Sequence, residues 1–230
     1  HAVSSRLREG QVTVVGNGSA CVVGGHAYII KKNQRFITNS AIASMGYDLP
    51  AAIGAWTASR DKGCYSQNGD RSGDDLILVT GDGSMQMNLQ ELQTIIHHRM
   101  GIKIFVINNG GYHSIRQTQR NFFGEPLIGI GVDSGDLSFP ALDKLAAAYG
   151  YPYVSARHNS QLGEAVEKTL AAEGPVICEV FVSMDQNFEP KSSAKRLPDG
   201  TMVSPPLEDL SPFLPDEEMD ENMIIPRIKG

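Results

Sequence analysis

The stretch that decides the fold runs from Leu76 to Gly111 and reads LILVTGDGSMQMNLQELQTIIHHRMGIKIFVINNGG. Residues 76–80 and 102–107 are short apolar runs rich in β-branched side chains, which is typical of buried parallel strands. Between them, apolar residues recur at helical spacing: Met85, Leu89, Leu92, Ile95 and Ile96. Gly101 follows a basic last turn, as at the end of a helix. The order of strand, Gly-Asp-Gly turn, helix, strand and Asn-Asn turn predicts one unit of a parallel α/β sheet.

A polar side chain follows each of these two predicted strands. Asp82 comes directly after the first strand, and Asn109 after the second. The carboxyl ends of parallel strands meet at one edge of a sheet, where open α/β sheets bind ligands. Carboxylate and amide oxygens suit Mg²⁺, and glycines let a backbone approach a diphosphate closely. The N-terminus of the helix expected after Ser84 favours the negative charge of such a ligand.

Gly81-Asp82-Gly83-Ser84, followed after the second strand by Asn108-Asn109, resembles the diphosphate-binding motif of thiamine diphosphate (ThDP) enzymes. Either half alone has an ordinary structural explanation, because Gly-Asp-Gly is a common turn and Asn-Asn-Gly-Gly is typical of a hairpin loop. Both halves together, each after a buried strand, favour the functional interpretation. In that family the metal takes the aspartate, the second asparagine and a backbone carbonyl two residues later. The resemblance therefore implies that Asp82, Asn109 and Gly111 hold Mg²⁺.

Residues 39–55, NSAIASMGYDLPAAIGA, closely resemble the acetolactate synthase and pyruvate oxidase branch of these enzymes. In that branch a methionine lies under the thiazolium ring and wedges the cofactor into its reactive V shape. The resemblance implies this role for Met45, whose flexible, polarisable side chain suits a ring contact, although core packing is the ordinary role of methionine in such a run. Ala43 would offer its backbone carbonyl to the exocyclic amine. The family usually has glycine there, a departure that a backbone contact tolerates.

The turn after residues 11–15 completes the predicted cofactor site. Val15-Gly16-Asn17-Gly18 aligns with a family segment that holds the diphosphate. The resemblance thus implies the following cofactor-binding residues: Asn17, Gly18, Ala43, Met45, Gly81, Asp82, Gly83, Ser84, Asn109, Gly111 and Tyr112. The same turn allows another interpretation, since Gly16 and Gly18 fit the first two glycines of a dinucleotide fingerprint. Cys21 stands at its third small position and no acidic residue lies at the expected distance, so that alternative is the weaker one.

The acceptor side of the pocket departs from the family. Acetolactate synthases carry Gln-Gly-Met-Val-x-Gln-Trp after the double asparagine, and the tryptophan packs beside the acceptor. The aligned run here is YHSIRQT, ending at Thr118. Gln117 matches and is implied as a catalytic residue, whereas Ser114 and Thr118 replace the methionine and the tryptophan. His113 and Arg116 add hydrogen-bond donors. A roomier, more polar pocket suits a bulkier acceptor such as a keto-sugar, and plain acetolactate synthesis stays equally open.

Strand and helix patterns alternate through the rest of the chain. Further strands are expected at residues 11–15, 35–38, 151–155 and 176–182, and further helices at 20–28, 49–59, 112–121, 140–149 and 160–172. The sequence predicts an α/β fold: a three-layer, doubly wound sheet of about six parallel strands with helices on both faces. Residues 61–75, rich in Gly, Asp and Ser, are expected to form a mobile surface loop.

Three regions are expected along the chain. Residues 1–10 are polar and indicate a linker or the remnant of a tag, and residues 11–185 form the ThDP diphosphate-binding domain. Residues 186–230 are basic, then rich in proline, then acidic, and we expect an extended C-terminal arm that is ordered or disordered with even odds. The net charge of −6 argues against a nucleic-acid partner and against attraction to anionic membranes. The absence of a leader-like segment and of a long apolar run favours a cytoplasmic protein.

The resemblance implies an enzyme that uses ThDP and Mg²⁺ to decarboxylate a 2-ketoacid, pyruvate for example, and to ligate the product to a carbonyl acceptor. In the family a glutamate on a pyrimidine-binding domain of the partner subunit completes the active site. No matching glutamate is found here, and Glu91 fits a solvated helix position. We therefore expect an inactive half-site, completed in a homodimer or tetramer, and FAD on a missing domain stays open. A subunit of a two-gene enzyme and a nucleotide-binding domain without ThDP are the alternatives.

Overall fold

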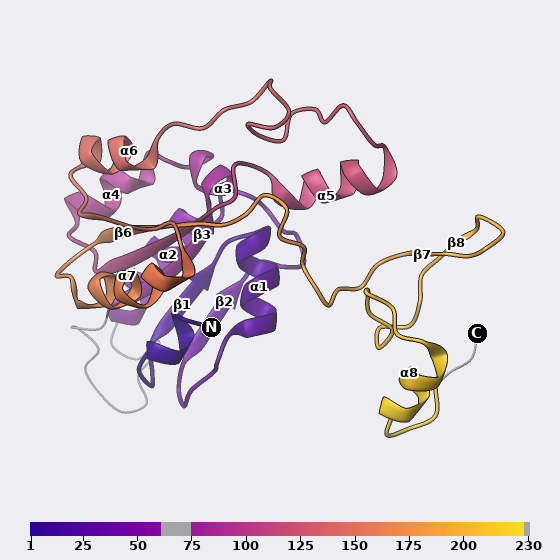
Figure 1. Cartoon of the computed structure of the whole chain (residues 1–230). Coiled ribbons are helices and arrows are strands. Elements are labelled where there is room, and N and C mark those ends of the chain that lie inside the picture. The colour runs from indigo at the N-terminus through magenta and orange to yellow at the C-terminus, as the bar shows by residue number, and fades with distance from the viewer. Residues whose placement is uncertain (61–74, 228–230) are drawn as a thin grey trace. The chain divides into compact units, whose positions relative to one another are not determined.

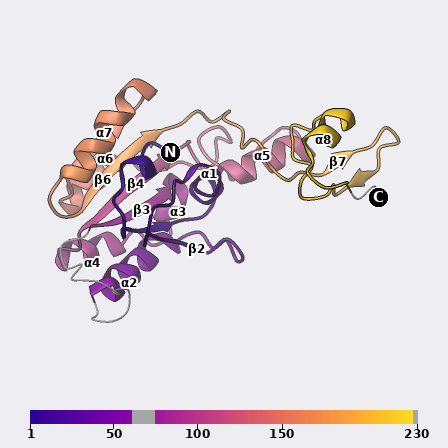
Figure 2. The ribbon, with the colours of Figure 1, turned by 90° about the horizontal axis from the view of Figure 1, so that it is seen from below.

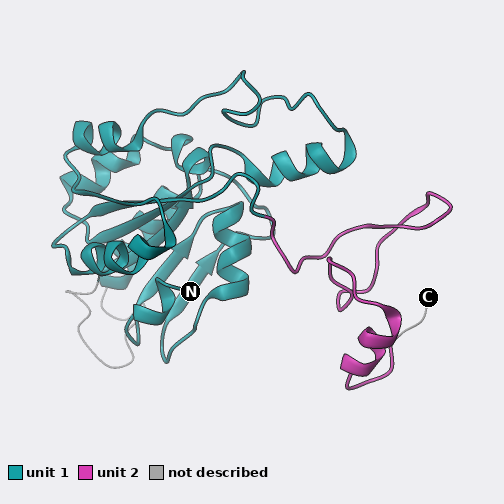
Figure 3. Ribbon diagram, viewed as in Figure 1, with its two compact units in different colours: residues 1–186 teal, residues 187–230 magenta. Residues whose placement is uncertain are grey.

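The computed structural model in Figure 1 describes residues 1–60 and 75–227, and the predicted surface loop at 61–75 therefore lies almost wholly outside the described residues. The chain forms two compact units, His1–Gln186 and Asn187–Gly230 (Figure 3). Within the described part of the chain, no helix is long and apolar enough to cross a membrane.

Unit 1 is built on one parallel sheet. Its strands are β1 (Val12–Val15), β2 (Arg35–Thr38), β3 (Leu76–Gly81), β4 (Ile102–Asn108), β5 (Tyr153–Ala156) and β6 (Val176–Phe181). They pair in the order β2-β1-β3-β4-β6-β5, and every pair is parallel. The apolar runs that predicted buried strands are therefore confirmed, and so is the sheet of six strands.

Helices cover both faces of this sheet. Those longer than seven residues are α1 (Ser19–Ala27), α2 (Asp48–Arg60), α5 (His113–Phe122), α6 (Leu142–Tyr149) and α7 (Asn159–Ala171). Side chains of α2, α4 (Glu91–His97) and α6 pack on one face, against residues such as Leu78 and Ile104. Side chains of α7 pack on the other face, against Ile77 and Phe105. Figure 2 shows α2 and α4 on the opposite side of the sheet from α1 and α7. The three-layer α/β prediction is confirmed.

The segment between β3 and β4 differs from the single helix that the sequence predicted. It forms two short helices, α3 (Asp82–Gln86) and α4, with a turn between them. Gly81 ends β3, and the other three residues of the motif, Asp82, Gly83 and Ser84, form the first turn of α3, so the helix starts before Ser84 and not after it. The turn has a side-chain cause, because Asn88 Nδ2 donates to the Gly46 carbonyl at 2.7 Å and so anchors the chain between the helices.

The first ten residues belong to unit 1, which differs from the expected linker. Residues Ser4–Arg6 form a short 3-10 helix, and Leu7 is 2% exposed in the cluster that covers the α7 face of the sheet. Lys31 Nζ donates to the carbonyls of Ser5 and Leu7 at 2.8 and 2.5 Å. The polar composition of the segment did not indicate that Leu7, together with Ala2 and Val3, packs on the sheet.

Unit 2 has local structure where an extended arm was expected. It contains the antiparallel pair β7 (Lys195–Arg196) and β8 (Met202–Val203), and helix α8 (Asp216–Asn222). Acidic residues fill the first turn of α8, where they interact favourably with the helix dipole. Met219 is buried on its inner side. The acidic run at 216–221 is thus helical.

Candidate functional site

A cavity of about 300 Å³ opens at the carboxyl ends of β1, β3 and β4. Four segments form it: the turn after β1, the loop before α2, the start of α3, and the Asn-Asn turn with the start of α5. The lining residues are Asn17, Gly18, Ser19, Val22, Ala43, Met45, Gly81, Asp82, Gly83, Ser84, Asn109, Gly111, Tyr112, His113, Ser114 and Ile115. Every residue that the sequence assigned to cofactor binding lies in this one cavity.

Asp82 is 7% exposed, and backbone amides hold both of its carboxylate oxygens. The N–H of Gly83 donates to Oδ1 at 3.0 Å, and the N–H of Gly111 donates to Oδ2 at 2.9 Å. Burial raises the pKa of Asp82 to about 6, against the opposing effect of these hydrogen bonds. A cation beside Asp82 would relieve this burial cost, since an opposite charge favours the ionised form.

The second polar group of the cavity is the side-chain amide of Asn109. Its Nδ2 donates to Ser19 Oγ at 2.8 Å, which fixes the orientation of the amide. Its Oδ1 is buried, and within residues 1–60 and 75–227 it has no hydrogen-bond partner. A buried amide oxygen without a partner costs free energy, and a metal ion would satisfy it. Sequence reasoning missed Ser19, whose only signal is its place at the start of the predicted helix after Gly18.

Two glycines of the site are required by contacts. A Cβ at Gly83 would overlap the ring of Tyr112, which packs directly on the backbone of α3. Gly111 pairs with Gly131 in an antiparallel bridge, and a Cβ there would overlap the carbonyl oxygen of Ile130. These close approaches let the Asn-Asn turn lie against α3, so that Asp82 and the Gly111 backbone meet.

Met45 lies in a loop with an unusual backbone. It lines the cavity and is not part of either buried core cluster. Ala43, two residues earlier, has a φ of 56°, and its carbonyl accepts a hydrogen bond from Asn17 Nδ2. The left-handed region costs a residue with a Cβ about 1–2 kcal/mol. Alanine at position 43 therefore costs conformational free energy that glycine would not cost, whereas the sequence suggested that the departure is tolerated.

Three residues expected to serve the acceptor are bonded to other parts of the chain or lie outside the cavity. Arg116 is fully buried, donates to the carbonyls of Asn109 and Gly110 at 3.2 and 3.1 Å, and binds the carboxylate of Asp133 with two hydrogen bonds of 2.7 and 2.8 Å. His113 lines the cavity, but its Nε2 bonds the carbonyl of Gln186 at 2.6 Å. The prediction that both supply free donors to an acceptor is therefore wrong.

The third of these residues, Gln117, does not line the cavity. Helix α5 begins at His113 and runs away from the site, so only its first turn, through Ile115, reaches the ligand space. Each further residue adds 1.5 Å along the helix axis. Glu91 is likewise outside the cavity, where its Oε2 accepts from Thr94 Oγ1 at 3.0 Å.

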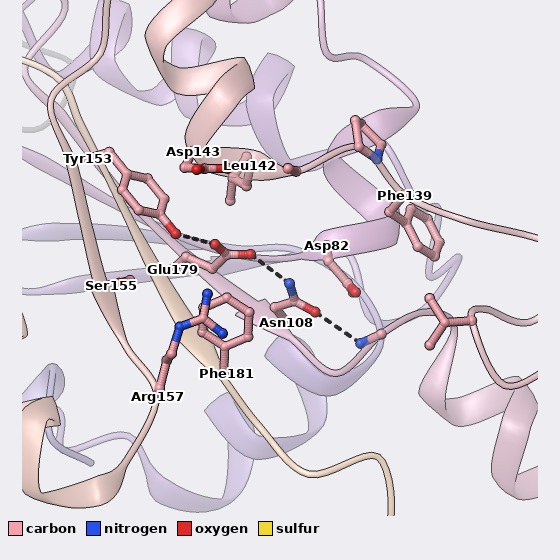
Figure 4. A pocket seen from close by; sticks show the side chains of 14 residues that line it. Asp82, Asn108, Phe139, Leu142, Asp143, Tyr153, Ser155, Arg157, Glu179 and Phe181 are labelled. Carbon is pink, nitrogen blue, oxygen red and sulfur yellow. Dashed lines mark hydrogen bonds between the residues drawn. The ribbon is translucent and has the colours of Figure 1, made fainter.

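A second cavity of about 310 Å³ shares Asp82 as a wall and lies at the carboxyl ends of β4, β5 and β6. Figure 4 shows Glu179 between Tyr153 and Asn108. Asn108 Nδ2 donates to Glu179 Oε1 at 2.6 Å, and the hydroxyl of Tyr153 donates to Oε2. Asn108 Oδ1 in turn accepts from the N–H of Gly110 at 3.0 Å. This network holds the Asn-Asn turn from the side of the second cavity.

Comparison with known proteins identifies the class of domain that this fold and site define. The family model described as "Thiamine pyrophosphate enzyme, C-terminal TPP binding domain" matches residues 16–180. The chain therefore belongs to the thiamine pyrophosphate enzymes, as their C-terminal, cofactor-binding domain. The matched residues include Gly16 and Gly18, so the dinucleotide-fingerprint alternative is set aside.

The chain is similar to acetolactate synthases within this family. The acetolactate synthase of Arthrospira platensis is 31% identical over 157 residues, which cover 68% of this chain and 24% of that protein. The acetolactate synthase large subunit of Cyanidium caldarium is 33% identical over 173 residues, covering 73% and 27%. The acetolactate synthase isozyme 2 large subunit of Escherichia coli (strain K12) is 30% identical, covering 77% and 29%. The chain thus spans about a quarter of the length of these relatives.

Proposed function

We propose that this domain holds the Mg²⁺ ion and the diphosphate of ThDP in an enzyme that decarboxylates a 2-ketoacid and ligates the product to a carbonyl acceptor. The observation that carries the proposal is the buried Oδ1 of Asn109, which has no partner in the described part of the chain and lines the same cavity as Asp82 and Gly111. An oxygen in this state, beside a carboxylate whose pKa burial raises, fits a hard divalent cation.

The ligand set is Asp82, Asn109 and the backbone carbonyl of Gly111. Each carboxylate oxygen of Asp82 accepts one backbone N–H and keeps lone-pair capacity for a metal. Ser19 directs the Asn109 amide so that its nitrogen is used and its oxygen stays available. This donor set offers only oxygen, which matches the preference of Mg²⁺ for carboxylates, carbonyls and phosphates.

When bound, ThDP would supply a nucleophilic carbon and an electron sink for the decarboxylation of the ketoacid. The domain's own residues bind and orient that group. The turn at Asn17 and Gly18 and the start of α3 at Gly83 line the space for a diphosphate. Met45 forms the apolar part of the same wall and supports the ring. The Ala43 carbonyl is the acceptor proposed for the exocyclic amine, beside the Asn17 amide that it already binds.

The acceptor meets a different wall from the one that the sequence suggested. The start of α5 contributes three residues to the cavity wall: His113, whose Nε2 is already bonded to the Gln186 carbonyl, Ser114 and Ile115. Arg116 does not line the cavity, and its guanidinium binds Asp133. This wall is compatible with pyruvate as well as with a larger carbonyl such as a keto-sugar. A competition assay with pyruvate and candidate keto-sugars decides between them, because a high rate of acetolactate formation without any sugar adduct would exclude the larger acceptor.

The whole enzyme needs parts that this chain does not carry. We propose a pyrimidine-binding domain with the activating glutamate, supplied by a partner subunit in a homodimer or tetramer or by a second gene product. A flavin on a further domain and a cytoplasmic location are compatible with this proposal. Pyruvate decarboxylation by the 230-residue chain alone, with ThDP and Mg²⁺ in excess, would contradict it.

Titration calorimetry of ThDP into the full-length protein with Mg²⁺ tests the metal site. Asp82→Ala and Asn109→Ala should each abolish Mg²⁺-dependent binding, because each removes an oxygen ligand. Asn159→Ala, at the exposed start of α7, is the matched control and should bind as the unchanged protein does. Unchanged affinity in either site variant would show that the ligand assignment is wrong.

A further inference from the structure

Asp48 is a fully buried carboxyl group for which the proposed function gives no role. It is the first residue of α2, and its exposed fraction is 0%. Ser84 Oγ donates to Asp48 Oδ1 at 3.0 Å, and Thr80 Oγ1 donates to Oδ2. Within residues 1–60 and 75–227, no lysine, arginine or histidine forms an ion pair with it. Burying a carboxyl group without such an ion pair is costly, so a specific use for it is expected.

The hydrogen bonds lead from Asp48 to the loop that carries Met45. The N–H of Gly46 donates to Ser84 Oγ at 3.1 Å in a buried contact. A serine hydroxyl has one hydrogen to donate. Because Ser84 gives that hydrogen to Asp48, its lone pairs stay turned to the Gly46 amide. The carboxyl group thus fixes the orientation of the hydroxyl that holds the loop.

Gly46 has a φ of 80°, in the left-handed region that glycine adopts without steric cost, and the bond to Ser84 selects one conformation of this otherwise free backbone. Its carbonyl is held separately by Asn88 Nδ2. The N–H and the carbonyl of Gly46 are therefore bonded by Ser84 and Asn88, which both follow β3. Asp48 in turn orients the hydroxyl of Ser84. Met45 stands immediately before this fixed residue.

Asp48 also touches the turn after β1. A Cβ at Gly16 would overlap the Asp48 carboxyl group, so the backbone of this turn packs directly on it. Gly16 is followed by Asn17 and Gly18, which line the cofactor cavity. Three cavity-forming segments therefore meet at one side chain: the turn after β1, the Met45 loop and α3.

We propose that Asp48 is a positioning residue, whose carboxyl group orients the Ser84 hydroxyl and through it holds the Gly46 backbone, so that Met45 stays in place at the cofactor cavity. The effect on the reaction rests on the proposed role of Met45, whereas the effect on the loop does not. The first measurement below is therefore made without cofactor.

The first test is hydrogen–deuterium exchange by mass spectrometry on the full-length protein, followed in peptides that cover residues 40–49. Asp48→Leu keeps the branching and the number of heavy atoms of the side chain, although it is bulkier, and removes the acceptor of two buried hydroxyls. Exchange in these peptides should become at least about tenfold faster. Ser84→Ala, which removes the hydroxyl itself, should have the same effect. Asp48→Asn keeps an acceptor oxygen, and exchange should stay within about twofold of the unchanged protein.

Tyr151→Phe is the matched control for the loss of a buried hydrogen bond. Tyr151 donates to the Leu92 carbonyl at 2.8 Å, away from the loop, and the variant should leave exchange at 40–49 unchanged. Unchanged exchange in Asp48→Leu or in Ser84→Ala would overturn the proposal. So would an equal acceleration in every peptide of Asp48→Leu, since that would mark a general loss of packing. If Asp48→Leu does not fold, Asp48→Ala, which also removes the acceptor, is compared with Asp48→Asn, and equal exchange at 40–49 in these two variants would overturn the proposal.

The second test is a double-mutant cycle with ThDP bound. Asp48→Leu should lower the rate of pyruvate decarboxylation much more than it lowers ThDP affinity, and should add little to Met45→Ala, because both act on the same loop. Fully additive losses would refute a route through Met45. If no ThDP binds to the unchanged protein, the proposed function fails, and the exchange result still decides whether Asp48 holds the loop.

Discussion

Replacing Arg116 by methionine should destabilise the protein far more than the same replacement of a charged residue on the surface. The guanidinium is fully buried and joins the Asn-Asn turn to the loop before α6. It makes two hydrogen bonds to Asp133 and one each to the carbonyls of Asn109 and Gly110. Methionine fills a similar volume but removes these four hydrogen bonds, so that, among the described residues, Asp133 keeps only Arg120 at 3.5 Å and the Gly110 carbonyl keeps only the Val132 N–H at 3.3 Å.

The expected loss follows from these contacts. Removing one partner of a buried ion pair costs about 3–5 kcal/mol. The side chain of Asp133 is 16% exposed, so water reaches part of it and the lower end, about 3 kcal/mol, applies. The matched control is Lys168→Met, which breaks an exposed pair with Glu164 at 2.6 Å and should cost less than about 0.5 kcal/mol.

Urea unfolding, followed by the fluorescence of Trp56, the single tryptophan, measures both variants. Arg116→Met should lower the midpoint by about 1–2 M, and Lys168→Met should barely change it. Hydrogen bonds from Arg116 lower the pKa of Asp133 from its ordinary 3.8, so their stabilisation is present above that pH and is lost as pH falls. The difference in free energy of unfolding between the unchanged protein and Arg116→Met should therefore become smaller below about pH 4. A loss under 1 kcal/mol at pH 7 would refute this account of Arg116.

Three further predictions concern the cofactor side. Ala43→Gly removes the steric cost of a φ of 56° and should stabilise the protein by up to about 1 kcal/mol in the same urea assay. Ala58→Gly in helix α2 is the control and should destabilise the protein by about 1 kcal/mol. A loss of stability in both variants would contradict the backbone argument. Met45→Ala should lower the decarboxylation rate more than ThDP affinity, and equal losses would mark Met45 as packing only. Mg²⁺ must displace the proton of Asp82, whose pKa burial raises to about 6, so affinity measured by calorimetry should fall about tenfold per pH unit below pH 6, and a flat profile would exclude Asp82 as a ligand.

The sheet and the cavity could be predicted because both depend on local patterns. Each apolar run is a strand, and Asp82 and Asn109 follow their strands directly, so parallel pairing alone brings them to one edge. The positions on α5 could not be predicted in this way. Arg116 and Gln117 are neighbours in a polar helix, and only the distant Asp133 decides that Arg116 turns inward.

The Ala43 and Asp48 results show the same limit for backbone conformation and burial. Nothing in the run NSAIASMGYDLP indicates that Ala43 has a positive φ or that Asp48 is fully buried. Both follow from contacts with Asn17 and Ser84 on other segments. Unit 2 adds a case of the same kind, since Lys195 lies 5.0 Å from the ring of Phe213 across a proline-rich stretch.

The strand order also has a consequence during synthesis of the chain. Every residue that lines the cofactor cavity lies between Asn17 and Ile115, and β2, β1, β3 and β4 are already neighbours in the sheet. The partner of the outer edge of β4 is β6, whose last residue is Phe181. Adding the chain from Asn108 to Phe181 takes a ribosome about 4–15 s. During that interval the nascent protein presents an unpaired apolar edge strand, which is the form most prone to aggregate.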